Sequence, residues 1–509
     1  MIGKKRGIVY LIGAGPGDPD LITLKGLRCL KSAHVVVYDY LVNESLLSLA
    51  DSDAEIIYVG KKSGLHTMHQ RDINKLLVEK ANEGLTVARL KGGDPFIFGR
   101  GGEEAVALSK AGITFEIIPG ITSAIAVPAY AGIPLTHRDH SSAACLITGH
   151  EDPEKDKSKI NWESLAQFSG TLVFLMGIAN LEKIAGKLVE NGLSEETPAG
   201  VVSNGTTPNQ RTVIGTLGTI CDRFTEQGLK PPGIIVVGDV VNLKERINWF
   251  ESRPLFGRVI LVTRPQEQAH DFTTRLTDLG ARCLLLPTIT IKPPESWKDL
   301  DEAIRNISVY DWILFTSING VKYFFDRLYN AGKDARSIGN VRIGAIGPKS
   351  EEALVERGIR PDLIPEEYFS GGVADALREY DIQDKRILMP RPLIAGKYLP
   401  EKLREMGALV DEVEAYRTVK PRDNQVEFDM LMKEEIDVVT FTSPSTVRNF
   451  VAMFKNRPVF EKLLRSKIAC IGPVTEKEAM KEGLKVSIVA NEYTAEGLSM
   501  AIADFLGKS

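Results

Sequence analysis

The sequence predicts an α/β protein with mostly parallel sheets, and three observations lead to this prediction. Short β-branched runs alternate with helical patterns along the whole chain. No apolar run approaches the length of a membrane span. The second half of the chain contains an internal duplication. A chain of 509 residues, 43% of them hydrophobic and 26% charged, has room for about three or four such domains.

Strands can be placed wherever a β-branched run is short and bounded by turn residues. The expected strands are Ile8–Ile12, Val35–Tyr38, Thr86–Leu90, Thr171–Leu175, Ile234–Val237, Val259–Val262, Trp312–Phe315 and Val438–Phe441. A proline and a charge cluster separate a helical segment from a new strand near residues 249–254. We therefore expect a domain junction at about residue 255, with residues 251–256 linking domains 1–250 and 257–509.

The second half is visibly doubled, with matching positions 125 to 127 residues apart. The matches, in order, are Arg264-Pro265 with Arg391-Pro392, Gly280-Ala281 with Gly407-Ala408, Thr316-Ser317 with Thr442-Ser443, Gly347-Pro348 with Gly472-Pro473, and Glu367-Tyr368 with Glu492-Tyr493. A period this long indicates two similar lobes rather than a solenoid. Two such lobes leave a cleft between them, the usual place for a ligand.

Composition argues against several classes of function. The formal net charge is −4, from 63 basic and 67 acidic side chains, so nucleic acid is not an expected partner. The five cysteines are never closer than 60 residues and form no CxxC pair, which argues against a disulfide framework or a zinc knuckle. His66 and His69 have no third ligand nearby, so no metal is expected. The short basic N-terminus is unlike a signal peptide, and we expect a cytoplasmic protein without a membrane partner.

A glycine-rich turn, Gly13-Ala14-Gly15-Pro16-Gly17-Asp18, follows the first strand. Such a turn brings the backbone close to a ligand, although a plain tight turn is the simpler interpretation. A dinucleotide fingerprint requires a third glycine where this chain has Asp18. Pro16 also removes a backbone donor at the point where a pyrophosphate would dock. A nicotinamide dehydrogenase is therefore disfavoured.

Two further stretches carry glycine or hydroxyl residues. In Arg89–Gly102, Gly92 and Gly93 allow a ligand to lie against the main chain, and Asp94 can accept a hydrogen bond from a ribose or an amine. The apolar residues 96–98 within that stretch suggest an ordered pocket wall rather than a flexible loop. Thr122 and Ser123 offer hydroxyls at an expected helix start.

Together these stretches resemble the uroporphyrinogen-III C-methyltransferases, within the tetrapyrrole methylase family. The likeness runs from Ile8 to Phe250 and rests on nine ordered motifs: GAGPGD, VVYD, VGKK, RLKGGDPFIFGRGGEE, PGITSA, GIPLTHRD, LVFLMG, NGT and NWF. It implies a two-domain fold, with subdomains of about 1–118 and 119–250, that holds S-adenosylmethionine as methyl donor between them. It also implies a homodimer formed through this half.

The resemblance assigns roles residue by residue. The cofactor-binding positions it implies are Pro16, Gly92, Gly93, Asp94, Ile97, Thr122, Ser123, Met176 and Gly205. Asp39 corresponds to the family's proton acceptor and Lys61 to its proton donor. Lys62 stands where the family often has arginine, which keeps the charge but loses the planar fork. Asp39 as a helix cap and Met176 as core filling are the structural alternatives.

C-methylation leaves a cationic pyrrole ring that must lose a proton, a task that suits the carboxylate of Asp39. The substrate carries many carboxylates, so the cleft should be basic. The candidate cations are Lys61, Lys62, Arg71, Arg89, Lys91, Arg100, His137 and Arg138, of which we expect about half to touch substrate. The substrate-binding set we favour is Lys62, Arg100, His137 and Arg138.

In the duplicated half, strands run into hydroxyl residues at helix starts, where free amides and the helix dipole favour anions. The hydroxyl residues expected to bind substrate are Thr316, Ser317, Thr442, Ser443 and Ser445. Any one of them could simply be a helix cap.

This half resembles uroporphyrinogen-III synthase from Gly257 to about Phe505. The likeness rests on the VTRP opening, the TSxNGV segment, AIGPKS, Tyr416-Arg417-Thr418 and FTSPSTV. It implies a two-lobed, parallel α/β fold, with lobe one at about 257–291 plus 418–509 and lobe two at about 292–417. It implies cyclisation of hydroxymethylbilane to uroporphyrinogen III with loss of water and without a cofactor. Tyr416 matches the family's suspected tyrosine, and a buried packing tyrosine is the equal alternative.

The product implied for the second half is the substrate implied for the first. We therefore expect a bifunctional enzyme that makes uroporphyrinogen III and then adds two methyl groups, at C-2 and C-7, giving precorrin-2 for sirohaem or cobalamin synthesis. The rival hypothesis keeps the methyltransferase but makes the second half a non-catalytic module that binds an anionic small molecule.

Overall fold

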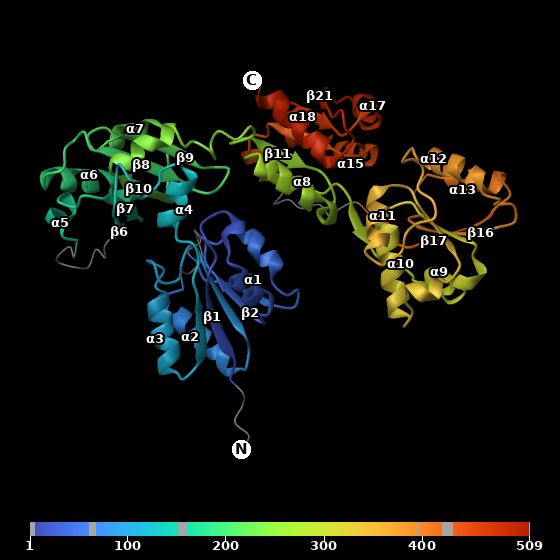
Figure 1. Ribbon diagram of the computed structural model, residues 1–509, viewed down its shortest axis with the longest axis horizontal. Coiled ribbons are helices and arrows are strands. Elements are labelled where there is room, and N and C mark those ends of the chain that lie inside the picture. The colour runs from blue at the N-terminus through green and yellow to red at the C-terminus, as the bar shows by residue number, and fades with distance from the viewer. Residues whose placement is uncertain (1–5, 61–67, 151–159, 394–395, 420–430, 508–509) are drawn as a thin grey trace, which may run out of the picture. The chain divides into compact units, whose positions relative to one another are not determined.

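A computed structural model describes residues 6–60, 68–150, 160–393, 396–419 and 431–507. The chain forms two compact units. The first is built around residues 6–258 and takes in residues 276–282 and the last residues of the C-terminal helix, from Ala503. The second holds Val259–Arg275 and Cys283–Ile502. The two are described separately below (Figure 1).

The first sheet of the first unit has helices on both faces. Its strands are β1 (Ile8–Gly13), β2 (Val35–Tyr38), β3 (Glu55–Tyr58), β4 (Val87–Lys91) and β5 (Thr114–Ile118), in the order β3-β2-β4-β1-β5. Every pairing between neighbours is parallel. Helices α2 (Gln70–Asn82) and α3 (Gly101–Lys110) cover one face, and α1 (Leu24–Lys31) covers the other (Figure 1). Parallel strands place all their carboxyl ends, and the loops that follow them, at one edge of the sheet.

The second sheet of this unit is mixed. Its strands are β6 (Ala144–Thr148), β7 (Thr171–Leu175), β8 (Pro198–Ser203), β9 (Arg211–Thr216) and β10 (Gly233–Val237), in the order β6-β7-β10-β8-β9. Only β6 and β7 pair in parallel, because β8 and β9 form a hairpin and β10 runs antiparallel to both neighbours. Helices α5 (Trp162–Ala166), α6 (Leu181–Glu190) and α7 (Ile220–Glu226) cover one face, and α4 (Ser123–Tyr130) covers the other.

The second unit contains two parallel sheets. One has the order β12-β11-β19-β20-β21. Its strands are β11 (Val259–Val262), β12 (Arg282–Leu285), β19 (Val438–Phe441), β20 (Lys467–Cys470) and β21 (Val486–Val489). Its helices are α8 (Gln266–Asp278), α15 (Pro444–Phe454), α16 (Pro458–Leu463), α17 (Pro473–Lys481) and α18 (Ala495–Gly507). The side chains of α15, α16 and α17 fill the core on one face of this sheet.

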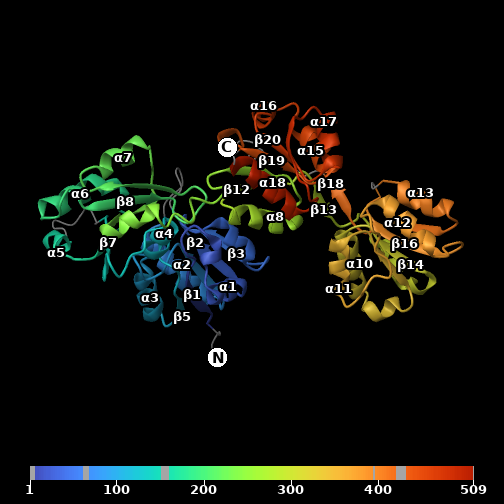
Figure 2. The same cartoon turned by 45° about the horizontal axis from the view of Figure 1, so that its top comes forward.

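The other sheet has the order β15-β14-β16-β17. Its strands are β14 (Trp312–Phe315), β15 (Arg342–Ala345), β16 (Arg386–Arg391) and β17 (Leu409–Glu414). Helices α9 (Lys298–Arg305), α10 (Ile318–Asn330) and α11 (Pro348–Val355) pack on one face, and α12 (Ser370–Ala376) and α13 (Tyr398–Glu405) on the other (Figure 2). An antiparallel pair, β13 (Thr290–Lys292) and β18 (Arg417–Val419), completes the described strands of this unit.

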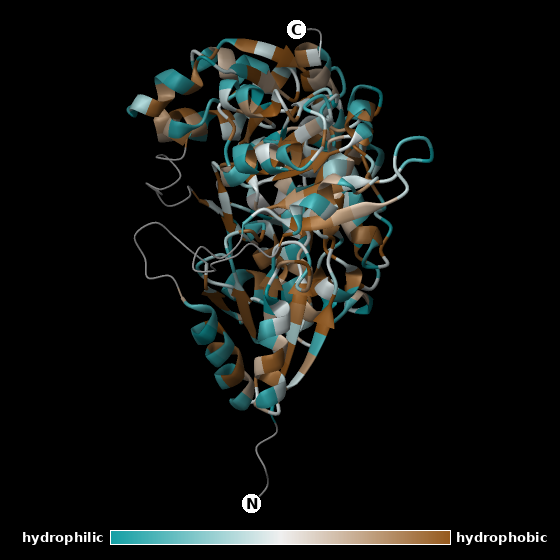
Figure 3. Cartoon of the chain, turned by 90° about the vertical axis from the view of Figure 1, so that its left-hand side faces the viewer, coloured by the Kyte–Doolittle hydropathy of each residue, from teal (hydrophilic) through white to brown (hydrophobic). Residues whose placement is uncertain are grey.

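Burial follows the hydropathy of the sequence. The strands are largely brown in Figure 3, whereas the helices carry both apolar and polar residues. The largest fully buried side chains include Trp312, Phe174, Phe272 and Phe441, which lie on or against the sheets. The expected α/β architecture with mostly parallel sheets is confirmed, and the antiparallel part of the second sheet is the departure from it. Among the described residues, no helix has the length and apolar character of a membrane span.

Candidate active site

Three loops meet at the carboxyl edge of the first sheet, and they are the three glycine- or hydroxyl-rich stretches of the sequence. The loop after β1 pairs with the loop after β4 through a bridge in which Gly15 N donates to Gly93 O at 3.2 Å and Gly93 N to Gly15 O at 2.9 Å. The loop after β5 joins them, because Gly120 N donates to Asp94 Oδ2 at 3.0 Å.

The glycines at this junction are required by close backbone approach. A Cβ on Gly120 would lie 2.4 Å from Gly93 O and 2.6 Å from Gly13 Cα, and backbone atoms cannot move aside as a side chain can. Gly93 has φ +72, and a Cβ there would meet nothing closer than Ser123 N at 3.7 Å. A side chain at Gly93 would therefore make ordinary van der Waals contact with the first residue of α4.

Asp94 organises this junction from within. Its Oδ1 accepts from Phe96 N at 2.8 Å and Ile97 N at 3.2 Å, while Oδ2 accepts from Gly120. Both carboxylate oxygens are therefore engaged with backbone amides of the chain itself. The apolar residues that follow, Phe96, Ile97 and Phe98, are 53%, 37% and 41% exposed, so they line no enclosed pocket in this structure.

The second sheet contributes the loop between β8 and β9. The Thr206 hydroxyl donates to Pro16 O and accepts from Asp18 N at 3.1 Å. Gly205 lies against α4, where a Cβ would come within 2.3 Å of Val127. The structure thus brings Pro16 and Gly205 to the same junction as the three loops.

Tyr130, on α4, also reaches the turn after β1. Its hydroxyl donates to Asp18 Oδ2 at 2.8 Å. Burial, followed by this bond to Asp18, raises the pKa of Tyr130 far above its ordinary value, so the phenol stays neutral. Asp18, which occupies the position of a third fingerprint glycine, therefore ties the turn to α4.

The remaining predicted cofactor positions lie on helix or strand ends. Thr122 is buried and caps α4, accepting from Ala124 N at 3.3 Å, and Ser123 begins that helix. Gly92 packs against Leu41, where a Cβ would come within 2.5 Å. Met176 follows β7 with φ 57 and is 52% exposed, so core filling does not explain it.

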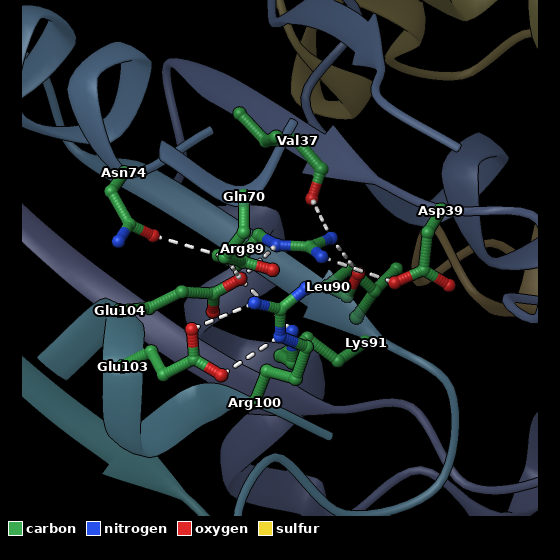
Figure 4. A network of polar contacts seen from close by, with 10 residues as sticks. All are labelled: Val37, Asp39, Gln70, Asn74, Arg89, Leu90, Lys91, Arg100, Glu103 and Glu104. Carbon is green, nitrogen blue, oxygen red and sulfur yellow. Dashed lines mark hydrogen bonds and ion pairs between the residues drawn. The ribbon is translucent and has the colours of Figure 1, made fainter. Parts of the chain in front are cut away.

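Asp39 follows β2 and lies in a network of charges. Its Oδ2 accepts from an Arg89 guanidinium nitrogen at 3.1 Å (Figure 4). Its Oδ1 accepts from Leu41 N at 3.2 Å. Arg89 and Lys91 are both ion-paired to Glu104 and are 3% and 4% exposed. Of the eight candidate cations, these two are therefore buried on a carboxylate of the chain itself.

The other predicted cations lie at the surface or outside the described residues. Arg100 forms a bidentate pair with Glu103 at 2.8 Å, and Arg71 is exposed on α2. His137 Nδ1 accepts from Asp139 N at 3.2 Å, next to an exposed Arg138. Lys61 and Lys62 lie outside the described residues. No described contact brings Arg100, His137 or Arg138 to Asp39.

In the second unit, Tyr416 and Ser317 meet. The Tyr416 hydroxyl lies 2.9 Å from Ser317 Oγ, and Ser317 caps α10 by accepting from Gly320 N at 3.1 Å. The Tyr416 ring stacks on Tyr323 with centroids 6.0 Å apart. Burial raises the pKa of Tyr416, and the hydrogen bond from Ser317 and the charge of Arg391 oppose this rise. The phenol is thus buried and hydrogen-bonded to Ser317 at the carboxyl edge of its sheet.

The matching helix start in the other sheet is α15. Ser443 caps it in a capping box with Thr446 and lies 2.9 Å from Ser445 Oγ. Thr316 and Thr442 are the half-buried residues just before the two caps. Ser317 and Ser443 have nearly the same backbone angles, φ −164 and −163. The duplication is therefore preserved at these two caps.

Two features were not identified from the sequence, a pair of largely buried arginines in the second half and a buried glutamate in the first. Arg391, at the end of β16, is 4% exposed, and burial lowers its pKa. Arg264, its counterpart in the duplication, also has a pKa lowered by burial. Their recurrence at matching positions was the signal that could have found them. The other missed group is Glu104, the last residue of the RLKGGDPFIFGRGGEE motif, whose buried partners the motif does not reveal.

Comparisons with known proteins find two families, each of which matches a different part of the chain. The family described as Tetrapyrrole (Corrin/Porphyrin) Methylases matches residues 8–221, and the family described as Uroporphyrinogen-III synthase HemD matches residues 270–499. The chain is 40% identical over 496 residues to "Porphyrin biosynthesis protein HemD" of Ruminiclostridium josui, which covers 97% of each chain.

Two further relatives are named as methyltransferases. "Uroporphyrinogen-III C-methyltransferase" of Bacillus subtilis (strain 168) is 44% identical over 363 residues, 70% of this chain and 74% of that protein. "S-adenosyl-L-methionine-dependent uroporphyrinogen III methyltransferase" of Methanosarcina barkeri is 54% identical over 239 residues, 47% of this chain and 94% of that protein.

Proposed function

The chain belongs to the tetrapyrrole methylases through its first half and to the uroporphyrinogen-III synthases through its second, and on that basis we propose two consecutive activities in one polypeptide. It is a bifunctional tetrapyrrole enzyme. The second half cyclises hydroxymethylbilane to uroporphyrinogen III with loss of water. The first half then transfers methyl groups to two ring carbons, C-2 and C-7, and releases precorrin-2.

The observation that carries the methyltransferase proposal is the junction of loops around Pro16, Gly93 and Gly120. Its close backbone contacts bring Gly93 next to the first residue of α4, with Ser123 N 3.7 Å from the position of a Cβ on Gly93. Those features fit S-adenosylmethionine, and the residues proposed to hold it are Pro16, Gly92, Gly93, Asp94, Ile97, Thr122, Ser123, Met176 and Gly205. Because both Asp94 oxygens accept backbone amides, we propose that Asp94 acts by shaping the loop.

When bound, S-adenosylmethionine supplies an electrophilic methyl group. The chain's own part is to orient the pyrrole carbon toward that group and to take the proton that the ring then loses. Asp39 is the proposed proton acceptor, since its side chain is 23% exposed while its charge partners are buried. Lys61 is the proposed donor. Lys62, Arg100, His137 and Arg138 are proposed to bind substrate carboxylates.

For the synthase, Tyr416 is the proposed hydrogen-bond donor to the departing hydroxyl of hydroxymethylbilane. A neutral phenol held by Ser317 suits this task, because it donates without ionising. The helix starts marked by Thr316, Ser317, Thr442, Ser443 and Ser445 are proposed to receive substrate carboxylates.

Ligand titration separates this proposal from a nicotinamide dehydrogenase. We expect the full chain to bind S-adenosylmethionine and not NAD in calorimetric titrations, and the reverse result would reject the methyltransferase. The binding-module hypothesis for the second half is tested with hydroxymethylbilane alone. Turnover to uroporphyrinogen III supports the synthase, whereas retention without turnover favours the module.

Three further points belong to the proposal. We propose a cytoplasmic homodimer formed through the methyltransferase half, whose mass light scattering can measure. We propose anionic tetrapyrroles as the partners and no cofactor for the synthase. Product analysis in cells would decide whether precorrin-2 feeds sirohaem or cobalamin.

A further inference from the structure

Four charged side chains lie together at the carboxyl edge of the first sheet. Asp39 follows β2, Arg89 and Lys91 lie on β4, and Glu104 lies on α3. β2 and β4 are parallel neighbours with Val37 opposite Arg89. Because side chains alternate along a strand, Arg89 and Lys91 point to the same face of the sheet, the face covered by α2 and α3. The cluster contains two cations and two carboxylates.

Glu104 is the centre of this cluster and has no exposed surface. Its Oε1 accepts from Arg89 Nε at 3.2 Å, Lys91 Nζ at 3.0 Å and Gln70 Nε2 at 3.1 Å (Figure 4). Gln70 is held in turn by Asn74, at 3.0 Å. Groups from one strand and one helix thus converge on a single carboxylate oxygen of α3.

Arg89 is fixed at each of its guanidinium nitrogens. Nε donates to Glu104, one terminal nitrogen donates to Leu90 O at 3.0 Å and Val37 O at 3.4 Å, and the other donates to Asp39. A planar fork held at all three nitrogens has one orientation. The contacts of Arg89 with Glu104, Val37 and Leu90 therefore fix the guanidinium nitrogen that donates to Asp39.

Exposure divides the four groups. Arg89, Lys91 and Glu104 have side chains that are 3%, 5% and 0% exposed, whereas that of Asp39 is 23% exposed. Burial, followed by the charge of Arg89, lowers the pKa of Lys91. Of the four side chains, only that of Asp39 is partly exposed to solvent, and the other three are buried.

We propose that Glu104 is a positioning residue for Asp39: it orients Arg89, and Arg89 holds the Asp39 carboxylate where it receives the proton from the methylated ring. This inference rests on the proposed function of the first half. Glu104 itself touches neither substrate nor cofactor in this account. Its loss therefore displaces the proton acceptor and leaves the cofactor loops in place.

The test uses the full chain with uroporphyrinogen III and S-adenosylmethionine. We expect Glu104→Gln to lower kcat for methyl transfer by about 10- to 100-fold, since small displacements of a reacting group have effects of that size. We expect KM for S-adenosylmethionine to stay within about twofold, because the removed interaction acts after cofactor binding. Arg89→Lys keeps the charge but loses the fork, so it should reproduce the kcat loss.

The matched control is Glu251→Gln, in the same unit. Glu251 is also a largely buried carboxylate with several donors: Lys244 Nζ at 2.7 Å, Gln210 Nε2 at 2.9 Å and the Thr212 hydroxyl. We expect this variant to lose stability and to keep kcat within about twofold, because it lies outside the Asp39 cluster.

Three results would overturn the inference: an unchanged kcat in Glu104→Gln, an equal kcat loss in Glu251→Gln, or a higher KM for S-adenosylmethionine with kcat unchanged. If Glu104→Gln does not fold, the same measurements of kcat and KM on Arg89→Lys test the inference. A parent protein that binds S-adenosylmethionine but transfers no methyl group would instead overturn the proposed function.

Discussion

At the scale of single residues, Tyr416 joins the structure of the second unit to its proposed chemistry. We predict that Tyr416→Phe lowers the rate of uroporphyrinogen III formation by about 10-fold, because a lost hydrogen bond of about 1.4 kcal/mol corresponds to that factor. Spontaneous closure to isomer I should rise in proportion. Isomer analysis of the product after incubation with hydroxymethylbilane measures both effects.

The control for that variant is Tyr310→Phe. Tyr310 is also a buried tyrosine of the second unit, and burial and its bond to Asp411 raise its pKa to about 12. It lies outside the proposed site, so its loss should change stability and not the isomer ratio. If both variants lower the rate equally, Tyr416 is a packing residue.

The buried thiol of Cys470 makes the free energy of unfolding of the second unit depend on pH in the alkaline range. It is fully buried at the end of β20, and burial raises its pKa from 9.0 to about 12. Above pH 9 the unfolded thiol loses its proton while the folded thiol keeps it, so this contribution to stability is present below pH 9 and is lost as pH rises. We predict that the parent loses about 1.4 kcal/mol more than Cys470→Ala between pH 8 and pH 10. Urea unfolding of both proteins measures the difference, and equal losses would contradict the prediction.

Other residue-level features could not be predicted from sequence. Arg89 and Lys91 stand in a motif rich in ligand-binding residues, and only the fold places Glu104 beneath them. The partners of Asp94 are a second example. Its Oδ1 accepts from amides of its own stretch, but its Oδ2 accepts from Gly120 N, which lies 26 residues further along the chain. A sequence gives the types of such groups but not their partners.

At the scale of elements, the loops after β1, β4 and β5 depend on glycine. We predict that Gly120→Ala weakens S-adenosylmethionine binding by at least about 10-fold, because its Cβ would lie 2.4 Å from Gly93 O. Calorimetric titration measures the affinity.

Gly102→Ala is the control for this substitution. Gly102 lies near the start of α3 with nothing within 4 Å of an added Cβ. That variant should bind S-adenosylmethionine as the parent does and be slightly more stable, since alanine favours a helix. Normal affinity in Gly120→Ala would show that the three loops tolerate separation.

All eight expected strands are present in the structure, because short β-branched runs between turn residues define them clearly. The antiparallel course of β10 was not predicted, because periodicity within a strand does not encode the direction of its neighbours. The duplication was visible because its matches fall where strands end and helices begin, at Ser317 and Ser443. The domain and lobe boundaries given above stay predictions.

At the scale of the whole molecule, we assign one of two consecutive reactions to each half of the chain. We predict that Asp39→Asn abolishes methylation and leaves cyclisation at the parent rate, whereas Tyr416→Phe slows cyclisation and leaves methylation of supplied uroporphyrinogen III unchanged. Separate assays of the two steps on each full-length variant test this. A variant that slows both steps equally would contradict the assignment of one activity to each half.

The most direct test of the central claim is to incubate the full chain anaerobically with hydroxymethylbilane and S-adenosylmethionine. The molecular masses of the products are then measured by mass spectrometry. We predict a tetrapyrrole that carries two added methyl groups, which requires both activities in the proposed order. Unmethylated uroporphyrinogen III would contradict the methyltransferase, and unmethylated isomer I would contradict the synthase.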